Sequence, residues 1–231
     1  MARHNHLVWI AIAVALLYTY TWSWPQTIAL ALLKGAAVTL LAVHCALTVR
    51  GAERWPLTAV FALGALGDIL LQWNIIVGAV AFTAGHVVAI RLYRRYRDEN
   101  VTSGARRSAW MITIAATLIT GIFAFAPIFS EFSIPHKMAS SIVFALAAIV
   151  YIMAVAGMAV SLWLSQFRHS GAAALGAFYF VVSDVLIIGR LGPLEHAPLI
   201  NEVIWALYIG AQVMICTGVI AGLQKTPMAK S

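Results

Sequence analysis

The chain consists of long apolar runs separated by short polar segments, and this alternation constrains its fold more than any other feature. A membrane-spanning helix needs about 20 mainly apolar residues to cross a hydrocarbon core about 30 Å thick. Eight such runs are present, near residues 7–24, 26–48, 57–73, 75–95, 109–128, 137–164, 171–190 and 199–223. Charged residues make up only 10% of the sequence, against about 25% in typical soluble domains. We therefore expect an all-α, polytopic membrane bundle of eight transmembrane helices, forming a single domain over residues 1–231.

The basic residues predict the orientation of this bundle, because cytosolic loops of membrane proteins are enriched in Lys and Arg. If the eight runs alternate across the membrane, twelve of the fifteen Lys and Arg residues fall on one side. Only Lys137 and Arg190 fall on the other side, and Lys34 lies within the second run. We therefore expect both termini to be cytosolic and, in a bacterium, an inner-membrane location. The net charge of +7 is explained by topology, so we expect membrane lipids and not nucleic acid as partners.

The first apolar run ends in a group of aromatic residues, which is typical of a membrane interface. They are Tyr18, Tyr20, Trp22 and Trp24. A cleaved signal peptide would instead end in small residues at the cleavage site. We therefore interpret the run as an uncleaved first span.

Two aspartates lie deep within apolar runs. Asp68 follows Gly67 in the third run and Asp184 follows Ser183 in the seventh, and aliphatic residues follow both acids. At 1.5 Å per residue, each lies about 17–18 Å from the cytosolic face. An aspartate at the centre of a membrane helix costs roughly 2.5–3.5 kcal/mol, so it is usually retained for a function. The two aspartates are therefore the first candidates for a site.

Other polar residues are expected at similar depth on other spans. In the eighth run Asn201, Trp205, Tyr208 and Gln212 recur at helical spacing, so they are predicted to share an inward face. Further candidates that would bind substrate or tune the acids are Lys34, His86, Tyr151 and Ser183. If Lys34 and both aspartates ionise, their charges sum to minus one. Retention of one carboxyl proton makes the set neutral, which predicts an acid and a base in one cavity.

Several other classes of site find little support in the sequence. His, Cys and Asp residues are not arranged at metal-ligand spacing, so we expect no metal and no cofactor. A structural ion pair between Lys34 and Asp68 remains an alternative, as does a proton-coupled transporter that uses the acids as a relay. An intramembrane aspartyl protease is a third alternative, although Ala65 replaces the first glycine of its Gly-x-Gly-Asp signature.

Five motifs in register carry a resemblance to a known family. They are the lysine of the second run, Leu66-Gly67-Asp68-Ile69-Leu70-Leu71, Ala81-Phe82-Thr83-Ala84-Gly85-His86, Ser183-Asp184, and Tyr208 with Gln212. In this combination the chain resembles the YhhN-like lysoplasmalogenase family. The resemblance implies an eight-helix membrane hydrolase that cleaves the vinyl ether bond of lysoplasmalogens. Its products would be a fatty aldehyde and glycerophospho-ethanolamine or glycerophospho-choline. We expect one of Asp68 and Asp184 to be the general acid and the other the base, without an assignment of which is which.

Overall fold

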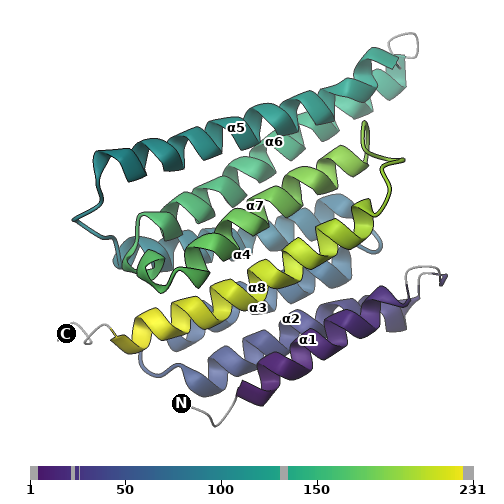
Figure 1. Cartoon of the computed structure of the whole chain (residues 1–231). Coiled ribbons are helices and arrows are strands. Elements are labelled where there is room, and N and C mark those ends of the chain that lie inside the picture. The colour runs from purple at the N-terminus through teal and green to yellow at the C-terminus, as the bar shows by residue number, and fades with distance from the viewer. Residues whose placement is uncertain (1–4, 22–23, 26, 131–134, 226–231) are drawn as a thin grey trace.

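The computed structural model describes residues 5–21, 24–25, 27–130 and 135–225, without the side chains of 127–130 and 135–141. These residues form eight α-helices and one short 3-10 helix (Figure 1). The α-helices are α1 (Asn5–Thr19), α2 (Ile28–Thr48), α3 (Arg54–Leu70), α4 (Ile75–Arg95), α5 (Ser103–Ser130), α6 (Pro135–Trp163), α7 (Ala172–Arg190) and α8 (Ile200–Lys225). The 3-10 helix η1 (Gln166–Ser170) lies between α6 and α7. The predicted all-α fold with eight helices is confirmed.

Six of these helices are long and apolar enough to cross a membrane: α2, α4, α5, α6, α7 and α8. The chain is therefore a multi-pass integral membrane protein. Helices α1 and α3 are shorter, with 15 and 17 residues, which corresponds to about 22 and 26 Å of helix. Shorter helices can still cross where the bilayer thins or flanking side chains reach its surface.

Helix α3 is displaced from the predicted span 57–73, because it begins at Arg54 and ends at Leu70. Pro56 fits within its first turn, where a backbone N–H has no helical partner anyway. At the other end the chain turns, and the side chain of Asn74 accepts hydrogen bonds from Ile76 N and Val77 N at 2.9 and 3.1 Å to begin α4. As a result Asp68 lies in the last turn of α3 and not at its middle.

The predicted aromatic belt after the first helix is only partly correct. Helix α1 ends at Thr19, several residues before the predicted end at 24. Tyr20 and Trp24 are exposed, as expected for a membrane interface, and Trp22 lies outside the described residues. Tyr18, in contrast, is buried and packs against Trp205 of α8, with 4.9 Å between ring centroids. It is a core residue because α1 turns this side chain towards the bundle.

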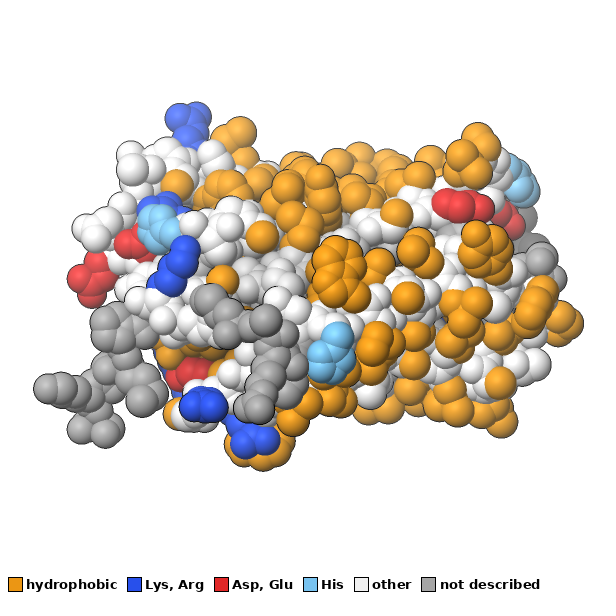
Figure 2. Space-filling view, turned by 60° about the horizontal axis from the view of Figure 1, so that its bottom comes forward, with side chains coloured by type: hydrophobic (Ala, Val, Ile, Leu, Met, Phe, Trp, Pro, Cys, Tyr) orange, Lys and Arg blue, Asp and Glu red, His pale blue; other side chains and the backbone are white. Residues whose placement is uncertain are grey.

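The helices run roughly alongside one another, with α3 packed between α2 and α4 and α7 against α8 (Figure 1). Helix α1 begins and α8 ends at the same end of the bundle, which also holds segments 49–53, 96–102 and 164–171. We refer to this as the arginine-rich end. Apolar side chains cover most of the face in Figure 2, and Lys and Arg gather near one end. Three charges of the orientation count, Arg3, Lys230 and the side chain of Lys137, lie outside the described part.

An ionic cluster joins two loops at the arginine-rich end. Asp98 Oδ2 lies 2.8 Å from Arg168 Nη2 and 3.1 Å from His169 Nε2. The backbone N–H of Asn100 donates to Asp98 Oδ1 at 2.9 Å. This hydrogen bond, helped by His169 and Arg168, holds the pKa of Asp98 below its usual value. The cluster ties the α4–α5 loop to the segment that follows α6.

Candidate active site

A cavity of about 170 Å³ lies in the half of the bundle away from the arginine-rich end. Six helices, α2, α3, α4, α6, α7 and α8, contribute to its wall. Its polar lining comprises Lys34, Asp68, Thr83, Tyr151, Asp184, Trp205 and Tyr208. The remaining wall is aliphatic and aromatic, from residues such as Leu71, Ile75, Phe82, Phe144, Ile187 and Ile204. The structure thus brings both predicted aspartates and the predicted lysine to one apolar cavity.

Asp68 is buried and is contacted from two other helices. Lys34 Nζ of α2 lies 3.8 Å from its Oδ1 atom, which is an ion pair rather than a short hydrogen bond. From α8, the hydroxyl of Tyr208 donates to Asp68 Oδ2 at 2.6 Å, and Gln212 Nε2 donates to the Tyr208 oxygen at 3.0 Å. These contacts form a relay from Gln212 through Tyr208 to Asp68. The carboxyl group is therefore fixed in position beside a cation.

Asp184 is equally buried but has different partners. The hydroxyl of Tyr151 on α6 donates to its Oδ2 atom at 2.8 Å. Within the described residues no Lys, Arg or His forms an ion pair with Asp184. The two acids of the cavity therefore differ: among the described residues Asp68 has an ammonium partner, whereas the partner of Asp184 is a neutral phenol.

Close contacts at two glycines bring the helices together around Asp68. Gly35 follows Lys34, and a Cβ atom at this position would lie 2.5 Å from Ile69 Cγ1 and 3.0 Å from the Ala65 carbonyl oxygen of α3. A Cβ at Gly67 would lie 2.5–2.9 Å from the ring of Phe82 on α4. Small residues that permit such approach are typical of helix contacts in membranes. Gly35 therefore lets α2 approach α3 closely enough for Lys34 to reach the acid.

His86 lies beside the cavity and not in its lining. It lines a separate pocket of about 20 Å³ together with Gln212 and Tyr93, and Phe82 lines both spaces. Its ring packs edge-on against Phe180, with 5.2 Å between centroids. Its Nε2 atom has no hydrogen-bond partner among the described residues. Gln212 is the predicted residue that connects this pocket to the cavity, through Tyr208.

Two of the other predicted site residues lie elsewhere. Ser183 is buried, but its hydroxyl donates to the Ile204 carbonyl oxygen at 3.1 Å, so it joins α7 to α8. Asn201 is exposed, and its Oδ1 atom accepts a hydrogen bond from Arg190 Nη1 at 2.7 Å. The expectation that Asn201 shares the inward face of α8 is therefore wrong. The part of α8 that lines the cavity begins at Ile204, in the second turn of the helix, whereas Asn201 lies in the first turn.

Three residues at or beside the cavity were not among the predicted site residues. Thr83 lines the cavity, and its position one turn before His86 was the available signal. Trp205 also lines the cavity, and its indole N–H donates to the Ala15 carbonyl oxygen of α1 at 3.0 Å. Its place on the predicted inward face of α8 could have identified it. For Tyr18, which accepts a hydrogen bond from Gln72 Nε2 at 3.3 Å, no signal distinguished it from its interfacial neighbours.

The cavity reaches the apolar surface of the bundle along α4. Ile76 and Val80 line it, yet their side chains are 52% and 64% exposed. Residues that belong to both the cavity wall and the outer surface mark the position of an opening. The opening therefore lies on an apolar surface of the bundle.

Comparison with known proteins identifies the family. No curated protein and no solved structure matches the chain. A model of the YhhN family matches residues 29–219. This range includes α2 apart from its first residue, all of α3 to α7, most of α8 and every residue of the polar cavity lining. The match covers most of the chain, and the matched range contains Asp68, His86 and Asp184. The protein therefore belongs to the YhhN family.

Proposed function

We propose that the protein is a lysoplasmalogenase, which hydrolyses the vinyl ether bond of lysophospholipids. The YhhN family includes lysoplasmalogenases, and membership suggests a hydrolase of this type. The observation that carries the proposal is the pair of unlike acids, Asp68 and Asp184, in one cavity that opens to the bilayer. A vinyl ether with an acyl-like chain is a substrate that can reach such a cavity laterally from the lipid.

The reaction needs one acid and one base. Protonation of the vinyl carbon that is not bonded to oxygen gives an oxocarbenium ion, and water then attacks the carbon attached to oxygen. Breakdown of the resulting hemiacetal gives the aldehyde and the free glycerol hydroxyl, so one water molecule is consumed for each bond cleaved. Glycosidases use two carboxyl groups for the same two tasks, donation of a proton and activation of the attacking water.

The environments of the two acids support an assignment of roles. Lys34 offsets a negative charge on Asp68, so we assign the carboxylate to Asp68, where it accepts a proton from the attacking water. Asp184 has no cationic partner among the described residues, so we assign the proton donor to Asp184. As Asp184 loses its proton, the Tyr151 hydroxyl stabilises the new carboxylate. With one proton on the pair, the charges of Lys34 and the two acids sum to zero.

His86 and Gln212 have supporting roles in this proposal. Gln212 orients Tyr208, which in turn fixes the base Asp68. His86 directs an unpartnered nitrogen into a pocket that adjoins this relay, and the volume of about 20 Å³ suits an ordered water molecule. The two residues would therefore position the base and water, not donate protons to the substrate.

The proposed membrane arrangement has all eight helices crossing and both termini in the cytosol. The concentration of arginines at the end where α1 begins and α8 ends supports it. Helix α7 is continuous where it carries Asp184, six residues before its last residue. Secondary transporters typically bind their substrates at broken helices, so this continuity favours the hydrolase over a proton-coupled transporter.

The proposal is tested by incubating purified protein with vinyl ether, alkyl ether and acyl lysophospholipids and measuring aldehyde release. We expect aldehyde from the vinyl ether lipid alone. Asp68→Asn and Asp184→Asn should each lower turnover by about 10²- to 10⁴-fold, as expected for loss of a general acid or base. Asp98→Asn makes the same chemical change outside the cavity and should retain activity.

Two results would contradict the proposal. One is near-normal turnover in either cavity variant whose melting temperature shows that it is folded. The other is cleavage of the acyl ester in place of the vinyl ether, which would indicate a lysophospholipase.

A further inference from the structure

Arg190 is a cation on the side of the bundle where cations are rare. It is the last residue of α7, at the end opposite the arginine-rich end, and it is partly buried. Its Nη1 atom donates to Asn201 Oδ1 of α8 at 2.7 Å. The acceptor is a neutral amide, so the hydrogen bond orients the guanidinium but does not neutralise its charge.

The pair formed by Arg190 and Asn201 lies next to the cavity. Arg190 is three residues after Ile187, and Asn201 is three residues before Ile204 and four before Trp205. These three neighbours line the cavity. Residues three or four apart on a helix are separated by about one turn, or about 5 Å along its axis. The pair therefore lies one turn beyond the cavity, towards the membrane surface.

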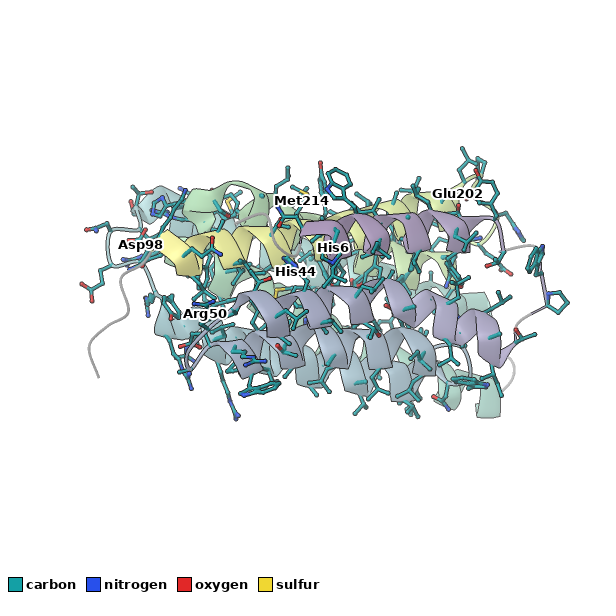
Figure 3. The ribbon with its side chains drawn as sticks, turned by 90° about the horizontal axis from the view of Figure 1, so that it is seen from below. His6, His44, Arg50, Asp98, Glu202 and Met214 are labelled. Carbon is teal, nitrogen blue, oxygen red and sulfur yellow. The ribbon has the colours of Figure 1, made fainter. Side chains whose placement is uncertain are left out.

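The charge of Arg190 is not matched by a carboxylate in the described part of the chain. Glu195 and Glu202 belong to the same end of the bundle, but neither forms an ion pair with Arg190 among the described residues. Figure 3 shows Glu202 at the end opposite Arg50 and Asp98. The guanidinium of Arg190 is thus a positive charge near the outer end of the cavity that a bound anion would neutralise.

We propose that Arg190, oriented by Asn201, binds the phosphate of a lysophospholipid whose vinyl ether lies between Asp68 and Asp184. This inference rests on the proposed function and adds the site that recognises the headgroup. A guanidinium presents parallel N–H donors that match two phosphate oxygens. Six residues, or about 9 Å of helix, separate Asp184 from Arg190, and helical side chains lean back towards the N-terminus. That spacing suits a substrate in which a three-carbon glycerol backbone separates the phosphate from the vinyl ether.

The arrangement also determines which leaflet supplies the substrate. Arg190 lies away from the arginine-rich end, which the proposed orientation places in the cytosol. The phosphate therefore binds at the non-cytosolic surface, and the acyl-like chain leaves through the opening at Val80.

The test is a binding measurement that requires no turnover. The purified protein in detergent is titrated with a 1-alkyl ether lysophospholipid and with a 1-alkylglycerol of the same chain length, which lacks the phosphate. Arg190→Gln should weaken binding of the lysophospholipid about 10- to 100-fold, the usual range for charged hydrogen bonds, and leave alkylglycerol binding within about twofold. Arg190→Lys should restore part of the loss. Arg94→Gln, an exposed arginine at the opposite end, is the matched control and should bind both ligands normally.

A second variant tests whether a loss of phosphate binding comes from the charge of Arg190 or from misfolding. Asn201→Asp gives Arg190 a carboxylate partner at the position of the present amide, so the fold should be retained while phosphate binding is lost. Equal weakening of both ligands by Arg190→Gln, or unchanged lysophospholipid binding in Arg190→Gln or Asn201→Asp, would overturn the inference. Selective binding by a protein that releases no aldehyde would refute the hydrolase proposal and retain the phosphate site.

Discussion

Tyr151→Phe is the substitution that most directly tests the assignment of Asp184 as the proton donor. It removes one hydroxyl, the one that donates to Asp184 Oδ2 at 2.8 Å, and retains the ring. A hydrogen bond to a neutral acid contributes about 0.5–1.5 kcal/mol, and one to a carboxylate about 1.5–3 kcal/mol. Since Asp184 becomes charged only as it gives up its proton, the difference of about 1–1.5 kcal/mol acts on the transition state. We therefore expect kcat to fall about 5- to 13-fold.

The corresponding change on the other acid should behave differently. The Tyr208 hydroxyl donates to Asp68. In the proposed mechanism Asp68 carries its charge before the reaction begins. Tyr208→Phe should therefore act mainly on stability, because it also deprives Gln212 of its acceptor. We expect it to cost about 1–3 kcal/mol of the free energy of unfolding.

The assay is aldehyde release over a range of substrate concentrations, with thermal unfolding measured on the same preparations. Tyr179→Phe is the matched control, since Tyr179 lies on α7 but lines neither the cavity nor the pocket of His86. It should change neither kcat nor the melting temperature substantially. Unchanged kcat in Tyr151→Phe would refute the role of its hydroxyl. A large kcat loss in Tyr208→Phe with none in Tyr151→Phe would reverse the assignment of acid and base.

Two further predictions concern stability. Gly67→Ala places a Cβ atom 2.5–2.9 Å from the Phe82 ring and should lower the free energy of unfolding by about 1–3 kcal/mol. In Gly210→Ala the added Cβ meets nothing within 4 Å, so this control should be neutral or stabilising. Equal shifts in melting temperature for the two variants would contradict this packing argument. The second prediction concerns Asp98, whose pKa is held below its usual value by the Asn100 N–H. The contribution of the Asp98 carboxylate to stability is therefore complete above about pH 5 and is lost as the pH falls through the lowered pKa. The difference in melting temperature between wild type and Asp98→Asn should therefore shrink between about pH 5 and pH 3, and a constant difference would contradict it.

The outcome at individual residues shows where sequence reasoning was sufficient. Lys34, Asp68 and Asp184 were selected because charges are costly within apolar runs, and the structure brings all three to one cavity. Tyr208 was selected by helical spacing, and it contacts Asp68 directly. The same spacing failed for Asn201, because the first turn of α8 lies at the surface of the bundle.

The sequence by itself determined the class of the protein, the order of its helices and the chemical groups available at membrane depth. It could do so because a backbone in lipid must satisfy its own hydrogen bonds, so a long apolar run has almost no alternative to a helix. Only the tertiary structure decided which groups contact the two acids: Lys34 pairs with Asp68, and the Tyr151 hydroxyl donates to Asp184. It also decided that Tyr18 faces inward. Every face of a membrane helix is apolar, so hydrophobic periodicity does not reveal which face turns inward. That choice depends on close packing at small residues such as Gly35, where two distant segments meet.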